Sequence, residues 1–312
     1  MGEILKNKVA VVTGAGRGVG RGIAMMMAEE GAKVVVNDFG GGVDGTGSSK
    51  EPANEVVEEI KNRGGTGFAN FGSVATPESA ENMIKAAVDS FGRIDILVNN
   101  AGITRDRMLF NMTDEEWDAV MKVHAYGTFY CTRAACRLMR QQRIGRIINI
   151  ISLTAFGNMG QSNYGAAKGA ILAFTRCVAQ DMGRYGITCN AIIPSGRTRL
   201  GWSPEIEAAW RKRVEAGEAP PTASLAEGGP PPPEQNAPLI VFLASDRASN
   251  INGRLFHIRG GMIHLYNEPA PIKTIWKTGA WTPEELVKVI PNTLAEGFVN
   301  PAPPKKPDEK KA

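Results

Sequence analysis

Five short apolar runs, each rich in β-branched residues, recur along the 312-residue chain. Each run is continuously apolar rather than alternating in polarity, which is typical of strands buried on both faces of a parallel sheet. The runs span residues 8–13, 33–37, 94–99, 146–151 and 187–193. Stretches with helical periodicity separate them, and strands that alternate with helices form right-handed βαβ units. The sequence therefore predicts an α/β fold with a doubly wound parallel sheet.

Helix start signals stand between these runs. Thr113 and Glu116 have the spacing of a capping box and predict a long helix that continues past Cys131. Pro77 stands at the first position of another predicted helix. Residues 255–258, just before a Gly-Gly pair, are predicted to be the last strand.

The chain is predicted to form one domain with a C-terminal extension. Residues 1–266 make up the domain, and residues 267–312 the extension, with one short capped helix from Thr282 onward and an end expected to be disordered. A long segment, about residues 196–233, interrupts the alternation near the carboxyl edge of the sheet. It contains a short helical stretch and a proline-rich loop, and we expect it to be a substrate lid.

Composition excludes several classes of function. The 36 Lys and Arg against 32 Asp and Glu give a net charge of +4, too small to indicate a nucleic acid or a membrane as partner. No apolar run approaches the ~20 residues of a membrane helix. The four cysteines lack the spacing of metal ligands, so we expect buried free thiols, no metal site and a cytoplasmic protein.

A glycine-rich string follows the first predicted strand and opens the first predicted helix. Such glycines permit a tight turn and let backbone N–H groups approach a pyrophosphate at the positive end of the helix. An acid at the end of the second strand completes the pattern of a Rossmann-type dinucleotide site. The predicted site residues are Gly14, Gly16, Arg17, Gly18, Val19, Gly20 and Asp38.

Tyr164 and Lys168 are four residues apart and so share one face of a predicted helix. An ammonium close to a phenol favours the phenolate, so the pair is predicted to be an acid/base with a Tyr pKa below its usual ~10. This spacing arises often by chance. Ser152 at the end of the preceding strand, together with the glycine-rich site, gives it meaning here.

In three motifs the chain resembles the short-chain dehydrogenase/reductase family over about residues 5–265: TGAGRGVG, NNAG at 99–102, and Ser152 with YGAAK at 164–168. Four longer segments resemble more closely the (3R)-hydroxyacyl-CoA dehydrogenase unit of peroxisomal multifunctional β-oxidation enzymes. They are NDFGGGVDGTGSSK, NNAGITRDRML, KVHAYGTFYCTRAA and GNMGQSNYGAAK.

The resemblance implies hydride transfer between a nicotinamide and a secondary alcohol or ketone. Tyr164 would be the general acid/base, Lys168 would lower its pKa and hold the ribose, and Ser152 would hydrogen-bond to the substrate oxygen. Further residues implied in the cofactor pocket are Asn99, Ala101, Gly102, Pro194 and Thr198.

Two positions depart from the family pattern. The usual Ser-to-Tyr spacing of thirteen falls on Ile151, which cannot donate a hydrogen bond, whereas Ser152 stands at twelve. We interpret this as a one-residue deletion in the following loop, with Thr154 as the alternative. His124 occupies the position where many members carry an Asn that anchors a proton-relay water, and an imidazole there is either a relay or structural.

Two residues bear on cofactor choice. Arg17 stands where NADP-using relatives often carry a basic residue for the 2′-phosphate, and Asp38 where NAD-using relatives carry an acid for the ribose hydroxyls. Because a carboxylate repels a phosphate, the resemblance implies NAD rather than NADP.

The resulting prediction is an NAD-dependent enzyme that oxidises a (3R)-hydroxyacyl-CoA, with a fatty or steroid side chain, to the 3-oxoacyl-CoA. The alternatives are a hydroxysteroid dehydrogenase, an NADPH-dependent 3-oxoacyl reductase, and a non-catalytic dinucleotide-binding scaffold. Family members pair the long helices that follow Thr113 and Asn163, so a homodimer or homotetramer is expected. Cations that could meet a CoA tail are Arg105, Arg107, Arg197, Arg199, Arg211, Lys212 and Arg213.

Overall fold

The computed structural model describes residues 2–202, 207–208, 212, 215 and 230–301. Its contacts divide the chain into two units, Met1–Tyr266 and Asn267–Ala312. The helical stretch predicted inside the lid falls largely outside the described residues, and so does the end of the extension after residue 301.

One sheet of eight strands organises the first unit, in the order β3-β2-β1-β4-β5-β6-β7-β8. The seven strands from β3 to β7 are parallel to their neighbours, and the strand order reverses between β1 and β4. The predicted Rossmann-type, doubly wound fold is therefore confirmed. The strands are β1 (Val9–Thr13), β2 (Lys33–Asn37), β3 (Thr66–Asn70), β4 (Ile96–Asn99), β5 (Gly145–Ile150), β6 (Ile187–Pro194), β7 (Leu255–Arg259) and β8 (Met262–Leu265).

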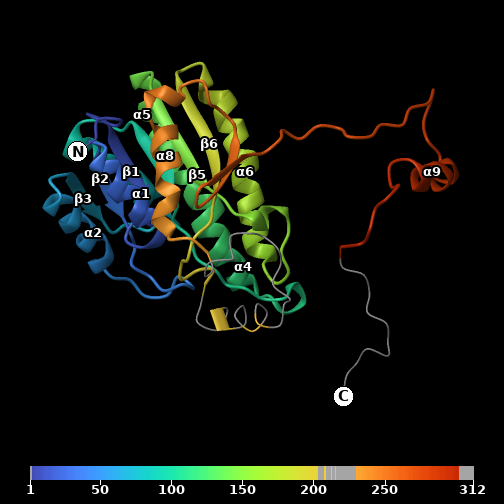
Figure 1. Ribbon diagram of the computed structural model, residues 1–312, viewed down its shortest axis with the longest axis horizontal. Coiled ribbons are helices and arrows are strands. Elements are labelled where there is room, and N and C mark those ends of the chain that lie inside the picture. Colours follow the sequence, from blue (N-terminus) through green and yellow to red (C-terminus); the bar gives the residue numbers. More distant parts are fainter. Residues whose placement is uncertain (1, 203–206, 209–211, 213–214, 216–229, 302–312) are drawn as a thin grey trace. The chain divides into compact units, whose positions relative to one another are not determined.

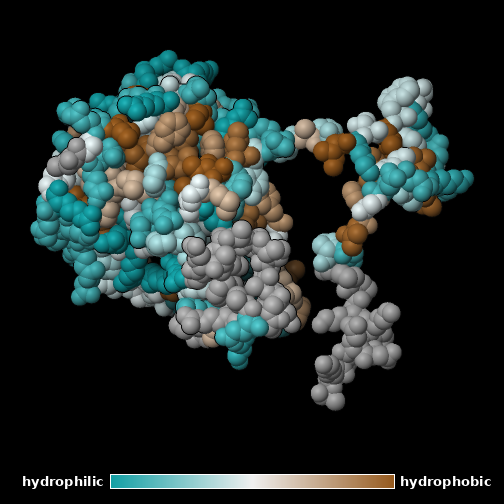
Figure 2. Space-filling model, viewed as in Figure 1, coloured by the Kyte–Doolittle hydropathy of each residue, from teal (hydrophilic) through white to brown (hydrophobic). Residues whose placement is uncertain are grey.

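Two of these strands were not predicted. β3 has polar residues at both ends, Thr66 and Asn70, contains Gly67 and is only partly buried, so it carries no continuous apolar run. β8 returns antiparallel to β7 after a Gly-Gly turn, and the prediction that the sheet ends at β7 is wrong. All four β8 residues are exposed, and Figure 2 shows apolar side chains gathered on this side of the unit.

Helices cover both faces of the sheet (Figure 1). One face packs against α1 (Gly18–Glu29), α2 (Glu51–Asn62) and α8 (Ala237–Ala244). The other packs against α3 (Pro77–Phe91), α5 (Gly127–Gln142) and α6 (Ser162–Gly183). Because both faces are covered, the central strands are buried throughout, which explains their unbroken apolar runs.

The long helix predicted from Thr113 has three parts: α4 (Asp114–Met121), a π-helical stretch (Lys122–Tyr126) and α5. Thr113 Oγ1 accepts from the Glu116 N–H at 3.2 Å, and the Glu116 carboxylate accepts from the Thr113 N–H at 3.0 Å. The predicted capping box is thus present. π-Helical turns inside α-helices are frequent at functional sites, and this one carries His124.

Two further features bear on the sequence predictions. All four cysteines are free, and Cys131 and Cys189 are buried as expected, whereas Cys177 is exposed. Tyr266, the last residue of the first unit, stacks on Phe156 with ring centroids 5.6 Å apart and an angle of 7° between the planes. Phe156 belongs to the loop between Ser152 and Tyr164.

The second unit contains one α-helix among its described residues, α9 (Pro283–Val289), followed by a 3-10 turn. Thr282 and Glu285 form its capping box, and Lys277 pairs with Glu285 at 2.5 Å. Large apolar side chains stay exposed here, including Trp276 and Phe298. Within the described part of the chain, the helices are too short or too polar to span a membrane.

The two capping boxes allow a matched test of stability. Thr113→Ala removes one side-chain cap and should lower the free energy of unfolding of the first unit by about 1 kcal/mol. Thr282→Ala removes the same interaction from the second unit and should leave that transition unchanged. Urea unfolding followed by tryptophan fluorescence measures both variants, and equal losses would contradict the division into units.

Candidate active site

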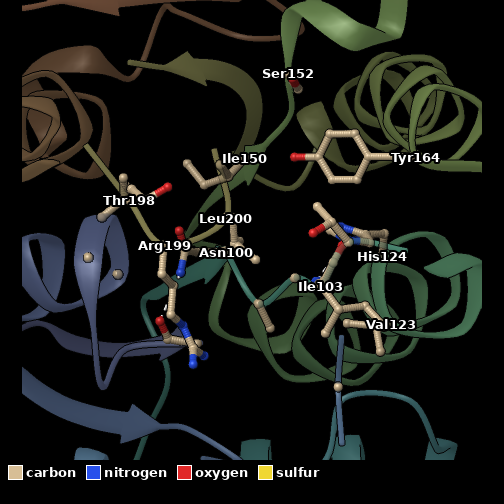
Figure 3. Close-up of a pocket in the computed structure, with 18 of the residues that line it drawn as sticks. Asn100, Ile103, Val123, His124, Ile150, Ser152, Tyr164, Thr198, Arg199 and Leu200 are labelled. Carbon is tan, nitrogen blue, oxygen red and sulfur yellow. Dashed lines mark hydrogen bonds between the residues drawn. The ribbon is translucent and has the colours of Figure 1, made fainter. Parts of the chain in front are cut away.

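A cavity of about 1120 Å³ opens at the carboxyl ends of the central strands, where the strand order reverses. This is the place where open α/β sheets bind their ligands. Its walls come from segments far apart in the sequence, and Figure 3 shows Tyr164, His124 and Ser152 on one side with Arg199 and Thr198 on the other. Predicted site residues that line it are Gly14, Arg17, Gly18, Val19, Gly20, Asp38, Ala101, Gly102, His124, Ser152, Tyr164, Lys168, Pro194 and Thr198.

The glycine-rich turn is packed against the segment that follows β4. Gly14 has φ +62°, and a Cβ there would lie 2.8 Å from Ala101 Cα. Asn100 Nδ2 donates to the carbonyls of Thr13 and Gly14 at 2.9 and 3.0 Å. Sequence reasoning named Asn100 only as part of its motif, yet this side chain fixes the backbone that would face a pyrophosphate.

Asp38 is held in a defined orientation at the end of β2. Its Oδ2 accepts from the Gly16 N–H at 2.8 Å, and its Oδ1 accepts from the Gly40 N–H at 2.7 Å. The side chain is nearly buried and lines the cavity, whereas Gly16 does not line it. Gly16 therefore acts by orienting Asp38, and this carboxylate keeps lone pairs for hydroxyl donors.

Arg199 lies at the same end of the cavity as Asp38, a position that the sequence did not predict. Its guanidinium donates to the Gly41 carbonyl at 3.0 Å. Burial, and then the neighbouring charge of Arg17, lower the pKa of Arg199, while Asp38 acts in the opposite direction. The sequence analysis placed Arg199 among cations for a CoA tail, but the structure groups it with Arg17 and Asp38.

The other proposed CoA cations are in part already engaged. Arg105 Nε donates to the Asp44 carbonyl at 2.9 Å, and Arg107 pairs with Glu116 at 2.7 Å. Arg211 and Arg213 lie outside the described residues.

Asn99 does not reach the cavity. Its Nδ2 donates to Thr132 Oγ1 at 3.0 Å and to Asn149 Oδ1 at 2.8 Å, and its side chain is buried. Asn149 Nδ2 in turn donates to Thr175 Oγ1 at 2.9 Å. Asn99 therefore ties β4 to β5 and α5 rather than touching a cofactor directly.

Lys168 and Tyr164 stand side by side at the inner end of the cavity. Lys168 Nζ donates to the Ile150 carbonyl at 2.7 Å and lies 5.5 Å from the Tyr164 ring centroid. Burial lowers the pKa of Lys168 to about 7. Burial raises the pKa of Tyr164 to about 12, a hydrogen bond with Ser152 opposes this, and Asp106 adds to it. The predicted lowering of the Tyr164 pKa is therefore wrong for this arrangement, because burial is the largest effect on it and raises it.

Ser152 and Tyr164 lie on the same side of the cavity (Figure 3), and their side chains form a hydrogen bond. Ile151, at the usual family spacing, is buried in the core with Ile171 and Ile193. Thr154 stands behind Ser152, with the two hydroxyl oxygens 3.1 Å apart. This arrangement supports the interpretation that the deletion lies after Ser152, whose role stays a proposal.

His124 is completely buried beside Tyr164. Its ring meets the Tyr164 ring edge-on with centroids 5.0 Å apart. Nε2 lies 3.1 Å from the Ile103 nitrogen and 2.8 Å from the Ile103 oxygen, while Nδ1 has no hydrogen-bond partner in the part of the chain that the structure describes. Burial and the charge of Lys168 lower the pKa of His124 to about 3, so the imidazole is neutral. Gly102 is required beside it, because a Cβ there would lie 2.5 Å from His124 Cε1.

The loop after β6 is fixed by a residue that sequence reasoning missed. Asn236 Oδ1 accepts from the Ser195 N–H at 3.0 Å, and its Nδ2 donates to the carbonyls of Ser195 and Pro233. This clamp joins the two ends of the segment predicted to be a lid. Pro194 and Thr198, on either side of Ser195, both line the cavity.

The residues present fit a dinucleotide. A glycine turn that side chains would block, a helix N-terminus behind it and an oriented carboxylate beyond β2 are three separate recognition elements along one cavity. The sequence model of the short chain dehydrogenase family matches residues 8–199, which is more than half of the chain. The chain belongs to the short-chain dehydrogenase family.

Individual relatives agree with the assignment. The dehydrogenase is 38% identical to the hydroxyacyl-CoA dehydrogenase ChsB1 of Mycobacterium tuberculosis, covering 93% of this chain and 90% of that one. It is 41% identical to the 3-oxoacyl-(acyl-carrier-protein) reductase FabG of Staphylococcus aureus, covering 82% and 98%. It is also 40% identical to the mouse peroxisomal multifunctional enzyme type 2 over 82% of this chain, but only 32% of that longer protein is covered.

A solved structure agrees as well. The crystal structure of a short chain dehydrogenase from Mycobacterium avium superimposes with a TM-score of 0.79 at 38% identity, covering 94% of this chain and 96% of that one. The predicted resemblance to this family, and to the dehydrogenase unit of multifunctional enzymes, is confirmed.

The buried imidazole predicts acid sensitivity. In the unfolded chain His124 takes up a proton below about pH 6.5, whereas in the folded dehydrogenase its pKa is about 3. Its contribution to stability is therefore present above pH 6.5 and is lost as the pH falls toward 3, by ~1.4 kcal/mol per pH unit. Urea unfolding near pH 7.5 and 5.5 should show that the wild type loses about 1 kcal/mol more than His124→Asn. Equal losses would contradict the buried neutral state.

The serine assignment is tested by comparing two hydroxyls. Ser152→Ala removes the group that faces Tyr164 and should lower kcat by roughly 10–10³-fold, the effect of losing one hydrogen bond to the reacting oxygen. Thr154→Ala should lower kcat far less, because Thr154 lies behind Ser152. Steady-state kinetics of both variants decides the point, and the reverse order of damage would move the role to Thr154.

Proposed function

We propose that this dehydrogenase oxidises a (3R)-hydroxyacyl-CoA, with a fatty or steroid side chain, to the 3-oxoacyl-CoA and uses NAD. The observation that carries the proposal is one cavity with a Ser152–Tyr164–Lys168 group at one end and the oriented Asp38 carboxylate at the other. The names of the M. tuberculosis and mouse relatives support the hydroxyacyl-CoA class.

The chain's own residues supply the proton chemistry. Tyr164 as phenolate takes the proton of the substrate hydroxyl, while Ser152 hydrogen-bonds to the same oxygen. Lys168, fixed by the Ile150 carbonyl, holds the ribose hydroxyls, and in its protonated form its positive charge favours the phenolate. Bound NAD supplies the acceptor for the hydride that leaves the carbinol carbon. His124 Nδ1, buried without a partner, is a site for an ordered water on the path of the proton.

A substrate panel tests the reaction. The protein should produce NADH from (3R)-hydroxyacyl-CoAs and not from their (3S) epimers, as read by absorbance. Tyr164→Phe keeps the ring packing and should lower kcat by about 10²–10⁴-fold while the affinity for NAD stays near normal. A variant that retains more than about half of the activity would remove Tyr164 from the mechanism.

Cofactor choice is tested at Asp38. A phosphate on the ribose would meet repulsion and would lose two charge-assisted hydrogen bonds of ~1.5–3 kcal/mol each. We expect at least a ~100-fold preference for NAD in kcat/KM, about 2.7 kcal/mol. Asp38→Ala should remove most of it, because Arg17 and Arg199 then meet the phosphate without an opposing charge. Equal use of NAD and NADP by the wild type would assign control to the two arginines.

An NADPH-dependent 3-oxoacyl reductase is the second candidate. The clustering of Arg199 with Arg17 favours it, as does the similarity to the S. aureus reductase. The cofactor measurement separates the two. A hydroxysteroid substrate is the further alternative, and steroid alcohols belong in the same panel. The non-catalytic alternative is set aside, because the family consists of dehydrogenases and reductases and the Tyr164–Lys168 pair is intact.

For assembly we propose a homodimer or a dimer of dimers that pairs α5 and α6, in the cytoplasm. Tyr126 and Phe129 are exposed on the long helix, and Phe129 meets Phe174 of α6 with ring centroids 6.1 Å apart. Light scattering at micromolar concentration tests the assembly, and a monomer would contradict it.

A further inference from the structure

The side chain of Asn163, the residue before Tyr164, is completely buried and joins three segments of the chain. Its Oδ1 accepts from the Tyr164 N–H on α6 at 2.7 Å. Its Nδ2 donates to the Arg105 carbonyl, in the loop after β4, at 2.9 Å and to the Glu116 carbonyl, on α4, at 3.1 Å. Both N–H donors and the acceptor oxygen of this one amide are therefore used, and each bond goes to a different segment.

The first turn of α6 takes its side-chain cap from Asn163. Gln161 stands at the N-cap position, but among the described residues its side chain makes no cap there and bonds to Asp106 instead. The first four N–H groups of a helix have no partner within the helix, and a buried one is costly unless another group accepts from it. The Asn163 oxygen accepts from the Tyr164 N–H, so the proposed acid/base is capped by its own neighbour.

The two carbonyls that receive the Asn163 amide belong to segments that are themselves held in place. Glu116 forms the capping box of α4 with Thr113. Arg105 is held on the side of the glycine-rich segment after β2, where its Nε donates to the Asp44 carbonyl at 2.9 Å. The amide therefore docks the first turn of α6 onto two fixed points.

An apolar contact continues this polar anchor along α6. Ala167 lies four residues after Asn163 and so shares its face of the helix. Ala167 packs with Ile103 and Val120 in a buried cluster, and the Tyr164 ring packs against that cluster. Apolar attraction has no preferred direction, whereas hydrogen bonds have narrow limits of distance and angle. The Asn163 amide is thus the part of this contact that can fix the rotation and height of the helix.

We propose that Asn163 is a positioning residue for Tyr164. By docking the first turn of α6, it sets where the Tyr164 hydroxyl stands relative to Ser152, with which that hydroxyl forms a hydrogen bond. The inference rests on the proposed function, in which Tyr164 takes the proton of the substrate hydroxyl. Asn163 itself does not line the cavity, so its effect on the reaction passes through Tyr164.

Two variants separate the hydrogen bonds of Asn163 from its shape. Asn163→Ala removes all three bonds. Asn163→Asp keeps the shape and an acceptor for the Tyr164 N–H, but turns a carboxylate oxygen toward two carbonyl oxygens, and none of these can donate. Because a misplacement of about 1 Å can cost about 10²-fold in rate, both variants should lower kcat by roughly 10–10²-fold. The Kd of NAD should change by less than about twofold, since the loss concerns a step after binding.

Asn190 offers the matched control. It is buried on β6, its Oδ1 accepts from the Arg254 N–H at 3.0 Å, and its Nδ2 donates to the Ile251 carbonyl at 2.8 Å. Asn190→Ala and Asn190→Asp therefore remove the same kinds of bond from a buried amide whose partners belong to the segment before β7. They should lower the melting temperature as the Asn163 variants do, but leave kcat per bound NAD unchanged.

A solvent isotope effect reports the placement of Tyr164 separately from stability. A misplaced phenolate slows the proton transfer, which then limits turnover in place of steps such as product release. Steady-state oxidation of (3R)-hydroxybutyryl-CoA by NAD is measured in light and in heavy water. The ratio of the two kcat values should be larger in both Asn163 variants than in the wild type, and should keep its wild-type value in both Asn190 variants.

The outcomes separate this inference from the proposed function. Wild-type kcat per bound NAD in Asn163→Ala or in Asn163→Asp, or an isotope effect that does not grow, would overturn the positioning role. If the wild type oxidises no hydroxyacyl-CoA, the proposed function fails, and hydrogen exchange then tests the anchor without any substrate. Exchange of the Tyr164 amide should be faster in Asn163→Ala than in Asn190→Ala, and equal rates would overturn the inference. Asn163→Ser takes the place of an alanine variant that does not fold.

Discussion

The candidate active site depends on a network of hydrogen bonds where β1 and β4 end side by side. Thr13 Oγ1 accepts from the N–H groups of Asn100 and Ala101 at 2.9 and 3.0 Å, and Asn100 Nδ2 returns to the carbonyls of Thr13 and Gly14. After β1 and β4 the chain continues toward opposite halves of the sheet. The backbone polar groups at these two strand ends therefore have no partners in the sheet. The network gives these groups hydrogen-bond partners and at the same time sets the shape of the cavity floor.

Around this floor, burial favours the neutral forms of three titratable groups. Lys168 and His124 both lose proton affinity through burial, and Tyr164 holds its proton more tightly for the same reason. Three polar residues thus stay close together with few full charges between them. A small change in local charge can then move a proton between them, which is the property an acid/base site requires.

Sequence predicted the parts of this protein that repeat a pattern. Buried parallel strands have unbroken apolar runs, and a glycine turn between strand and helix has a fixed spacing, so both were visible. β3 and β8 were not, because Gly67 interrupts one and the other is an exposed edge strand without a buried face. Asn236 and the position of Arg199 beside Arg17 and Asp38 were missed for another reason. Their partners are distant in sequence, and no local spacing encodes such contacts.

The raised pKa of Tyr164 was also missed because its cause lies in residues distant in sequence. From sequence, only the helical neighbour Lys168 could be placed beside the ring, and its charge argues for a lower pKa. The walls that exclude water come from several other segments, among them those that carry Ile103 and His124. The burial that they produce raises the pKa of Tyr164, and no spacing in the sequence shows it.

The stacked pair of Tyr266 and Phe156 has a mechanical consequence. Tyr266 is the last residue before the extension, and Phe156 lies on the loop that joins Ser152 to Tyr164. The point where the chain leaves the sheet is thus fastened to that loop by two parallel rings. Strain applied at this junction, by a graft or by an inserted residue, reaches the serine loop directly. A residue inserted after Asn267 lies beyond the stacked pair and does not act on the serine loop through it.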